Sequence, residues 1–523
     1  MRMAERIYRQ GILPSGERLH GIHPGGVEVS GANAACVLCH RRSGMGMIEG
    51  RRVVLPIAGP FLLQPRAQTA AELNNLFARS IDFAHAYGMN RTLVPYTDNL
   101  LARAIRKGIN AAGKPLDDLM PRFSLNAANT QLLVKYIERL SDQWSPGVTE
   151  DTMRFATVFT PGVDLAKRQA MLEVLRSYFE VRNTDRQRTN NYERGHARSG
   201  YKTARTWELQ FWFLHGPEDT WGKQLSKKYR RHPVFALISG LAQGSWQPVH
   251  EFCERQRLPC WFPTVDAPVV AEDDFYSTYF SRGVFLEADI LAQRFSEQYR
   301  QGTLQHVLQI GGNNPTASAA TGALRHALQW AGGVPMDEWR LKKVTADALR
   351  QIMTHAGPND GVVFWLTENE LVRLEQVPVP TAAVYFSAIM DDGEKAPLPP
   401  AWRAQAQMAY PFELPGKRKA NMSFFRAWLK RRNVPLLDER VQTDAYLACE
   451  FMAQQIDAMN EYLFRDYLLE RAENKLSSKL ENPHYRHLSL GPGQHFAAKG
   501  GYIVRLRSPD NGQMKAETGY IVP

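Results

Sequence analysis

Two cysteines and a histidine near the amino terminus have a spacing that supports chemistry. Cys36, Cys39 and His40 form the pattern C-x-x-C-H. In this pattern the two thiols bond to the vinyl groups of a haem, and the imidazole of the next residue lies under the iron as an axial ligand. The sequence therefore predicts one covalently bound haem c, attached through Cys36 and Cys39, with His40 as an iron ligand.

Two other kinds of site use a similar pair of cysteines, and both fit this sequence less well. A closed zinc site usually draws on a second Cys or His pair, and residues 1–145 hold no other cysteine. A thioredoxin-like redox pair needs a β-α-β setting, whereas the residues around Cys36 are typical of loop and helix. We prefer the haem interpretation and keep zinc as the alternative.

The elements that position this motif are expected to be helices and loops, with no convincing strand in residues 1–145. Apolar spacing and glycine or proline positions predict a loop over 41–65 and helices over 4–10, 30–40, 69–85, 97–110 and 126–144. Ser145-Pro146-Gly147 marks a domain boundary, which separates a first domain, 1–145, from a second domain, 151–523.

Residues 1–145 resemble the single-haem, soluble cytochrome c family, which implies an all-α domain. A small-residue segment enters C-x-x-C-H, a loop rich in glycine and proline follows, and Met120-Pro121 precedes a final amphipathic helix. In that family the methionine of Met-Pro binds iron, so the resemblance implies that Met120 lies opposite His40. His/Met ligation fills all six iron positions and favours one-electron transfer. The expected partner is a dehydrogenase or another cytochrome, and no enzymatic activity is expected.

The sixth iron ligand and the partner of the His40 ring have alternatives. The family's Pro-x-Leu-x-Gly loop matches residues 55–59 with the proline displaced by one position, so the carbonyl of either Leu55 or Pro56 accepts the His40 proton. The competitors of Met120 for the iron are Met45, Met47, Met89, His20, His23 and His85.

Strands alternate with helices after the boundary. Strands are predicted over 155–159, 207–214, 234–239, 260–262, 306–310, 362–366 and 382–386, a polar loop over 183–205, and a hairpin over 501–507 and 518–522. This order of elements indicates parallel strands joined by right-handed crossovers, hence doubly wound sheets. Two such series predict a two-lobed α/β domain.

This larger domain resembles periplasmic solute-binding proteins of the branched-chain amino-acid type, the receptors of ABC importers. The likeness lies in a strand that runs into Thr160-Pro161-Gly162, in the segments 237–240, 249–254 and 258–263, and in Tyr279–Gly283 before a helix. The resemblance implies a periplasmic-binding-protein-like fold with a ligand cleft between two lobes. An alternative function follows from it, in which the chain is a binding receptor and haem is a structural or redox-sensing element.

The cleft residues are expected at the carboxyl ends of the strands, where open α/β sheets bind ligands. Hydroxyls would hold a ligand carboxylate, and Asp266 or Glu368 would hold an ammonium group. The candidate residues are Thr160, Ser239, Ser245, Thr264, Asp266, Asn313, Thr367 and Glu368. A nucleotide site is disfavoured because Gly311-Gly312-Asn313-Asn314 lacks the pattern of a phosphate-binding loop.

The remaining cysteines are expected to be structural. Cys253 and Cys260 are seven residues apart across a helix-to-strand turn, so they form either a disulfide or two buried thiols. Cys449 lies on the apolar face of a predicted helix and is expected in the core. Covalent haem and disulfides both belong to oxidising compartments such as the periplasm.

Composition and charge exclude several classes of protein. Hydrophobic residues make up 44% of the 523 residues and charged residues 22%, which is ordinary for a globular chain. The net charge of +11 is not gathered in a basic tail, so nucleic-acid binding is not expected, and no apolar run is long enough for a membrane span. The segment Met1–Arg6 lacks the apolar core of a secretory signal, and we expect export nonetheless, with the signal outside the sequence shown.

Overall fold

The computed structural model describes residues 2–49, 52–68, 91–195, 205–271, 274–391, 393–475, 483–506 and 514–523. The chain divides into two compact units. The first is Met1–Thr149 with Met452–Lys475, and the second is Glu150–Phe451 with Leu476–Pro523. The division falls within a few residues of the predicted boundary. Residues 452–475, which the sequence placed in the second domain, belong to the first unit.

Six whole helices and the last turns of another, α18 (Glu439–Met459), belong to the first unit among the residues that the structure describes. The six whole helices are α1 (Arg2–Gln10), α2 (Val37–His40), α3 (Gly59–Leu62), α6 (Asp98–Lys107), α7 (Ala127–Glu138) and α19 (Arg465–Lys475). The side chains of Thr97 and Asn126 accept backbone N–H groups and so start α6 and α7. Ile7 and Tyr8 of α1 pack in one core with Leu133, Val134 and Ile137 of α7.

Short antiparallel strands also belong to this unit, so the expectation of an all-α domain without strands was wrong. The strands are β1 (His20–Ile22), β2 (Glu28–Ser30) and β7 (Arg122–Phe123) in one sheet, and the pairs β3 (Met47–Glu49) with β4 (Arg52–Val54) and β5 (Arg66–Gln68) with β6 (Arg91–Leu93). Strands of two or three residues are too short to show an alternating pattern in the sequence.

The helix predicted over 30–40 is broken in the structure. Gly31 has a φ of 57°, in the left-handed region, and begins a 3-10 turn over Gly31–Ala34. The α-helix that follows, α2, has only four residues. A glycine in this conformation interrupts a right-handed helix. The helix predicted over 69–85 lies outside the described residues.

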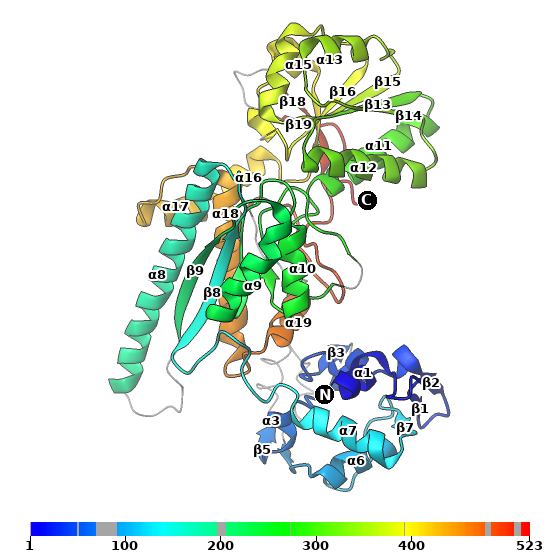
Figure 1. Cartoon of the computed structure of the whole chain (residues 1–523), viewed down its shortest axis with the longest axis vertical. Helices are drawn as coiled ribbons and strands as arrows, with labels where there is room; N and C mark the ends of the chain where they lie inside the picture. Colours follow the sequence, from blue (N-terminus) through cyan, green and yellow to red (C-terminus); the bar gives the residue numbers. More distant parts are fainter. Residues whose placement is uncertain are drawn as a thin grey trace. The chain divides into compact units, whose positions relative to one another are not determined.

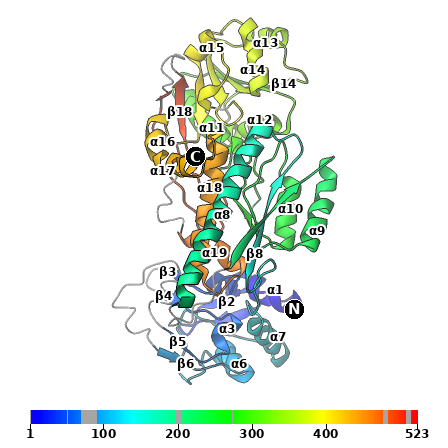
Figure 2. The ribbon, with the colours of Figure 1, turned by 90° about the vertical axis from the view of Figure 1, so that its left-hand side faces the viewer.

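The first lobe of the second unit is a five-stranded parallel sheet in the order β12-β11-β10-β8-β9. Its strands are β8 (Thr152–Phe159), β9 (Thr206–Phe213), β10 (Ala236–Ile238), β11 (Cys260–Trp261) and β12 (Ser277–Thr278). Figures 1 and 2 show α8 (Leu165–Gly195) on one face and α9 (Trp221–Arg231) with α10 (Gln247–Gln256) on the other. Numbered by their order in the chain, these strands lie side by side in the order 2-1-3-4-5. This is a doubly wound topology, and its connections change direction between β8 and β10.

The second lobe repeats this order in a seven-stranded sheet, β14-β13-β15-β16-β17-β18-β19. The parallel strands are β13 (His306–Gly311), β14 (Met336–Arg340), β15 (Asp360–Trp365), β16 (Ala383–Ser387) and β17 (Gln407–Tyr410), and the antiparallel ones are β18 (Tyr502–Leu506) and β19 (Met514–Ala516). Figure 1 shows α11 (Val284–Arg300) and α12 (Pro315–Trp330) on one face, and α13 (Ala346–Met353) with α15 (Pro400–Gln405) on the other. Doubly wound parallel sheets in two lobes are therefore confirmed.

Two segments differ from the sequence prediction. Helix α8 continues to Gly195, so residues 183–195 are helical and not part of a polar loop. The hairpin is confirmed, but its second strand is β19, and residues near 518–522 contribute only the bridge between Gly501 and Ile521. No helix in the described part of the chain is long and apolar enough to cross a membrane.

The chain between and after the lobes adds further helices. These are α14 (Glu368–Leu371), α16 (Pro415–Asn421), α17 (Ser423–Arg431) and α18 (Glu439–Met459). After α19, the carboxyl-terminal segment returns to the first lobe, where Phe496 pairs with Tyr279.

Candidate functional site

A cavity of about 700 Å³ in the second unit is lined by residues of both lobes. The first lobe contributes Val163 and Asp164 after β8, residues 241–243 after β10, and Thr264 and Asp266 after β11. The second lobe contributes Ala388, Ile389 and residues 393–395 after β16, and Tyr410 and Phe412 at the end of β17. The wall is completed by Pro415, Gly416, Arg418, Lys419, Arg426, residues 436–441 and His484. The cavity therefore lies at carboxyl ends of strands, where ligands bind open α/β sheets.

Of the eight residues predicted for the cleft, the structure places Thr264 and Asp266 on the wall of this cavity. The side chain of Ser239 is buried against the sulfur of Met171, and that of Ser245 accepts the backbone N–H of Gln247 at 3.1 Å. Thr160 accepts the N–H of Gln243 at 2.9 Å, so it positions a wall residue without lining the cavity itself.

The other three candidates lie on the loops after β13 and β15, which do not line the cavity. Glu370 accepts the N–H and the hydroxyl of Thr367, so these polar groups at the start of α14 are paired with each other. Its carboxylate also lies beside Gly312, where an added Cβ would come within 2.7 Å of its oxygens. The second lobe's residues on the cavity wall follow β16 and β17, and not β13 and β15. For this reason the cavity is not lined by Asn313, Thr367 or Glu368.

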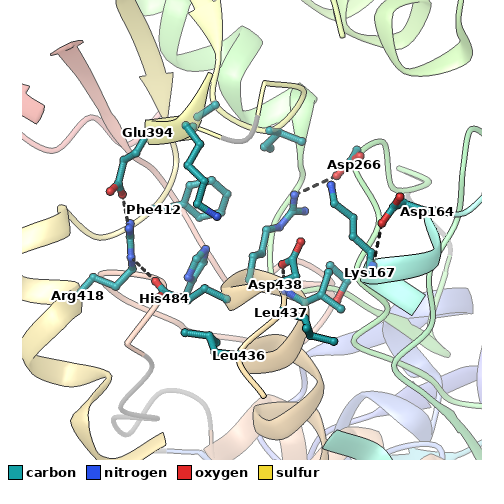
Figure 3. Close-up of a pocket in the computed structure, with 18 of the residues that line it drawn as sticks. Asp164, Lys167, Asp266, Glu394, Phe412, Arg418, Leu436, Leu437, Asp438 and His484 are labelled. Atoms are coloured by element: carbon teal, nitrogen blue, oxygen red, sulfur yellow. Dashed lines mark hydrogen bonds and ion pairs between the residues drawn. The ribbon is translucent and has the colours of Figure 1, made fainter. Parts of the chain in front are cut away.

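Charged residues of the wall form ion pairs across long stretches of sequence (Figure 3). Arg440 Nη1 lies 3.0 Å from Oδ1 of Asp266, whose side chain is 42% exposed. Arg418 pairs with Glu394, and its Nε donates to Glu439 at 3.0 Å. Sequence reasoning missed both arginines, because neither stands in a motif and each meets its acid only after folding.

Apolar and aromatic surface lies beside these charges. The guanidinium of Arg440 stands 5.6 Å from the centre of the Phe412 ring, and His484 meets the same ring edge-on at 4.7 Å. Burial lowers the pKa of His484, and Arg418 and Arg440 lower it further, so this imidazole is neutral. Leu436 and Leu437 are 46% and 45% exposed on the same wall.

The C-x-x-C-H motif forms the short helix α2 in the first unit. Cys36 and His40 are half-buried and Cys39 is exposed, and all cysteines are free thiols. Burial lowers the pKa of His40 to about 4, and the backbone carbonyl of Leu55 opposes part of that shift. Nδ1 of His40 is buried and makes no hydrogen bond to the described residues.

Met120 and Cys36 pack against the same hydrophobic cluster of the first unit, although they are far apart in sequence. Among the competing residues, Met45 is buried at 1% exposure, and His23 Nδ1 lies 3.1 Å from the carbonyl oxygen of Asp118. Met89 and His85 lie outside the described residues.

The loop after the motif is held by α19, a helix from the far end of the chain. Glu470 accepts the backbone N–H of Ser43 at 3.0 Å, and Arg41 pairs with Glu473. Burial raises the pKa of Glu470 to about 7, and Arg41 opposes the rise. The segment that follows His40 is therefore positioned by residues more than 400 positions away in the sequence.

Cys253 and Cys260 are fully buried free thiols that pack in one cluster of the first lobe. The structure thus contains two buried thiols and not the disulfide that was the other expectation. Cys449 is buried in α18, as the apolar face of that helix predicted.

Comparison with known proteins gives a likeness of fold. No family model matches the sequence, and no curated protein matches it. The crystal structure of a branched chain amino acid ABC transporter from Thermus thermophilus with bound valine covers 71% of this chain and 97% of its own, with a TM-score of 0.54 and 11% identity. A fatty acid ABC transporter substrate-binding protein from Thermomonospora curvata covers 73% and 95%, with a TM-score of 0.51 and 13% identity.

At these identities the likeness concerns the fold alone, and it does not bear on the C-x-x-C-H motif. About 70% of the chain, with its two lobes and parallel sheets, has the periplasmic-binding-protein-like fold of ABC-transporter substrate-binding proteins.

Proposed function

We propose that the chain is a periplasmic binding receptor whose cavity takes a small organic carboxylate with an apolar part. The observation that carries this proposal is Arg440 beside Phe412 on the cavity wall. A guanidinium can hold a carboxylate through two parallel hydrogen bonds. The aromatic ring and the exposed Leu436 and Leu437 offer surface to an apolar part of the same molecule.

The present partner of Arg440 supports this assignment. Asp266 is itself a carboxylate, it is partly exposed to solvent, and it lies in the loop after β11 on the same cavity wall. A ligand carboxylate entering the cavity would exchange with Asp266 on the guanidinium of Arg440. The two similar structures are named for valine and for fatty acid, and both of these molecules are carboxylates with an apolar part.

Calorimetric titration of the purified protein with valine and with octanoate tests this function. We expect saturable binding of at least one of them, and Arg440→Gln should weaken it by about 10- to 100-fold, the worth of hydrogen bonds to a charged group. Asp266→Asn keeps Arg440 and frees its guanidinium, so this variant should bind at least as tightly as the unmodified protein.

The matched control is Arg154→Gln, since Arg154 pairs with Glu208 in the first lobe and does not line the cavity. Its affinity should equal that of the unmodified protein. Equal affinity in Arg440→Gln, with an unchanged thermal midpoint, would exclude Arg440 as the carboxylate-binding residue.

We also propose that the first unit binds one haem c through Cys36 and Cys39, with His40 and Met120 as axial ligands, and exchanges electrons with a partner protein. When bound, the haem supplies reversible one-electron chemistry. The neutral ring of His40 suits an iron ligand, and Cys36 and Met120 pack against one cluster. The Leu55 carbonyl, one of two acceptors considered from the sequence, acts on the His40 ring and would orient it.

Intact mass spectrometry tests the attachment on protein produced in a periplasm with haem-attachment machinery. The mass should exceed that of the polypeptide by one haem, and Cys36→Ala/Cys39→Ala should remove the difference. Met120→Ala should open the iron to carbon monoxide, whereas the unmodified protein should not bind it. A bare polypeptide mass would overturn haem binding and leave the receptor function in place.

A further inference from the structure

A cluster of metal-binding side chains lies in the first lobe and does not line the cavity. His250, Glu254 and Asp274 each offer a donor atom, and these atoms lie within 4.8 Å of one another. His250 and Glu254 are four residues apart on α10 and therefore share one face of that helix. His250 is only 3% exposed, so the cluster is not a group of solvated surface charges.

The imidazole of His250 is held from both sides. Nε2 lies 2.7 Å from Oδ2 of Asp274, and Nδ1 lies 2.8 Å from the hydroxyl of Tyr279. A tyrosine hydroxyl can donate or accept a hydrogen bond. Nδ1 can therefore take the ring proton from Nε2 without losing its partner, which leaves Nε2 able to bind a metal ion.

The carboxylate of Glu254 is fixed by the chain that follows Asp274. It accepts the N–H of Phe275 at 3.0 Å, the N–H of Tyr276 at 2.9 Å and 3.1 Å on its two oxygens, and the hydroxyl of Ser277 at 2.8 Å. These contacts use about four acceptor positions of the carboxylate, so a metal ion would take the place of one of them, such as the longer contact with Tyr276. Such supporting hydrogen bonds are typical of metal ligands.

A second histidine stands nearby on the carboxyl-terminal segment. Nδ1 of His495 lies 3.1 Å from the carbonyl oxygen of Ser277, which can only accept, so Nδ1 carries the proton and Nε2 has a free lone pair. This Nε2 is buried and makes no hydrogen bond to the described residues. His495 is held beside β12 because its carbonyl accepts the N–H of Tyr279 at 2.8 Å.

We propose that His250, Glu254 and Asp274 bind one divalent metal ion of the zinc type, with His495, whose nitrogens lie outside that group of atoms, as a fourth ligand once its ring moves toward them. Two imidazoles and two carboxylates form a nitrogen and oxygen set that suits zinc, whereas calcium takes six to eight oxygens. The ring proton between His250 and Asp274 moves to Nδ1 of His250, so the ion can take its place on Nε2 without a net loss of protons. The bonds of the ion join α10, the segment before β12 and the carboxyl-terminal segment.

Zinc titration by calorimetry tests the site. Every sample carries Cys36→Ala/Cys39→Ala, because the thiols of the C-x-x-C-H motif would also bind zinc. We expect one site, a raised thermal midpoint with zinc and weaker binding of calcium. His250→Asn and Asp274→Asn should each weaken zinc binding at least about tenfold.

The matched control is His306→Asn. His306 and Asp337 form a similar pair at 3.5 Å in the second lobe, where the described residues supply no third donor, so this variant should keep full zinc affinity.

A weaker zinc affinity in His495→Gln supports His495 as the fourth ligand, and an unchanged affinity excludes it. The metal site would be overturned if the Cys36→Ala/Cys39→Ala protein did not bind zinc, or if the addition of Asp274→Asn left its zinc affinity unchanged. The visible absorption of cobalt bound to the Cys36→Ala/Cys39→Ala protein reports the ligands without a substitution at a buried residue. Nitrogen and oxygen ligands give visible bands without the charge-transfer band of a thiolate.

Discussion

At the scale of single residues, burial controls the titration of several acids in the second unit. Glu287 on α11 is fully buried; it accepts the Ser387 hydroxyl at 2.5 Å and the N–H of Ile389 at 3.0 Å. Burial raises its pKa to about 8, although these hydrogen bonds oppose the rise. Burial also raises the pKa of Asp391, and the charge of Glu287 adds to that effect.

Glu287→Gln should change how stability depends on pH. The pKa of Glu287 is about 8 in the folded chain and about 4.3 in an unfolded chain, so between these values only the folded state holds the proton. Stability of the unmodified protein should therefore fall as pH rises through this window, by up to about 1.4 kcal/mol per pH unit from this group. The variant should lack this contribution.

Urea unfolding at several pH values between 5 and 9 measures the difference between the two proteins. Glu297→Gln, an exposed substitution on the same helix, serves as the control and should not alter the pH slope. Parallel curves for the unmodified protein and Glu287→Gln would contradict a raised pKa.

At the scale of elements, side chains connect segments that no regular pattern joins. Asn183 of α8 donates from Nδ2 to the carbonyl of Trp207 and accepts the Trp207 N–H at Oδ1, both at 2.9 Å. Trp207 lies on β9, the edge strand of the sheet. The side-chain amide of Asn183 exchanges hydrogen bonds with its backbone as a residue of a neighbouring strand would. This contact attaches the polar stretch after Tyr178 to the edge of the sheet.

Asn183→Ala should destabilise the second unit by about 1–3 kcal/mol, since two hydrogen bonds to a strand are lost. The neighbouring Thr184→Ala removes only an exposed bond back to Glu180 of the same helix, and its effect should stay within about 0.5 kcal/mol. Chemical unfolding of both variants provides the comparison. A smaller loss in Asn183→Ala than in Thr184→Ala would refute the role of this amide.

The first unit depends on α19 in the same way. Asp466 pairs with Arg9 of α1 at 3.0 Å, and Glu470 accepts the N–H of Ser43. Residues 1–149 produced alone should therefore unfold at a lower temperature than the same residues joined by a flexible linker to residues 452–475. Differential scanning calorimetry of the two chains gives the answer, and equal midpoints would show that α19 is not needed.

At the scale of the whole molecule, one helix belongs to both units. Helix α18 begins with Glu439 and Arg440 on the cavity wall, and its last turns, from Met452, belong to the first unit.

A cavity ligand that shifts the haem potential must itself bind the oxidised and reduced protein with different affinities, because such coupling is reciprocal. Each tenfold difference in ligand affinity between the oxidised and reduced protein corresponds to about 59 mV in a one-electron potential. Redox titration with and without octanoate measures the shift, with Arg440→Gln as the uncoupled control. An unchanged potential, at ligand levels that saturate the cavity, would mean that the chain only tethers two independent modules.

The sequence by itself determined the local features of this protein. Cys36, Cys39 and His40 are close enough in sequence to form a motif, and the buried parallel strands, such as β13 and β15, are mostly apolar segments with helices between them. These signals are local, so the doubly wound sheets, the two lobes and the place of Thr264 and Asp266 at a strand end could be predicted.

Only the tertiary structure decided which distant residues meet. Asp266 and Arg440 are 174 positions apart, and Ser43 and Glu470 are 427 apart. Ion pairs and buried acids of this kind depend on where helices cross strands, which spacing along the chain does not encode. The short strands around the C-x-x-C-H motif also depend on their partners, because two or three residues hold no pattern of their own.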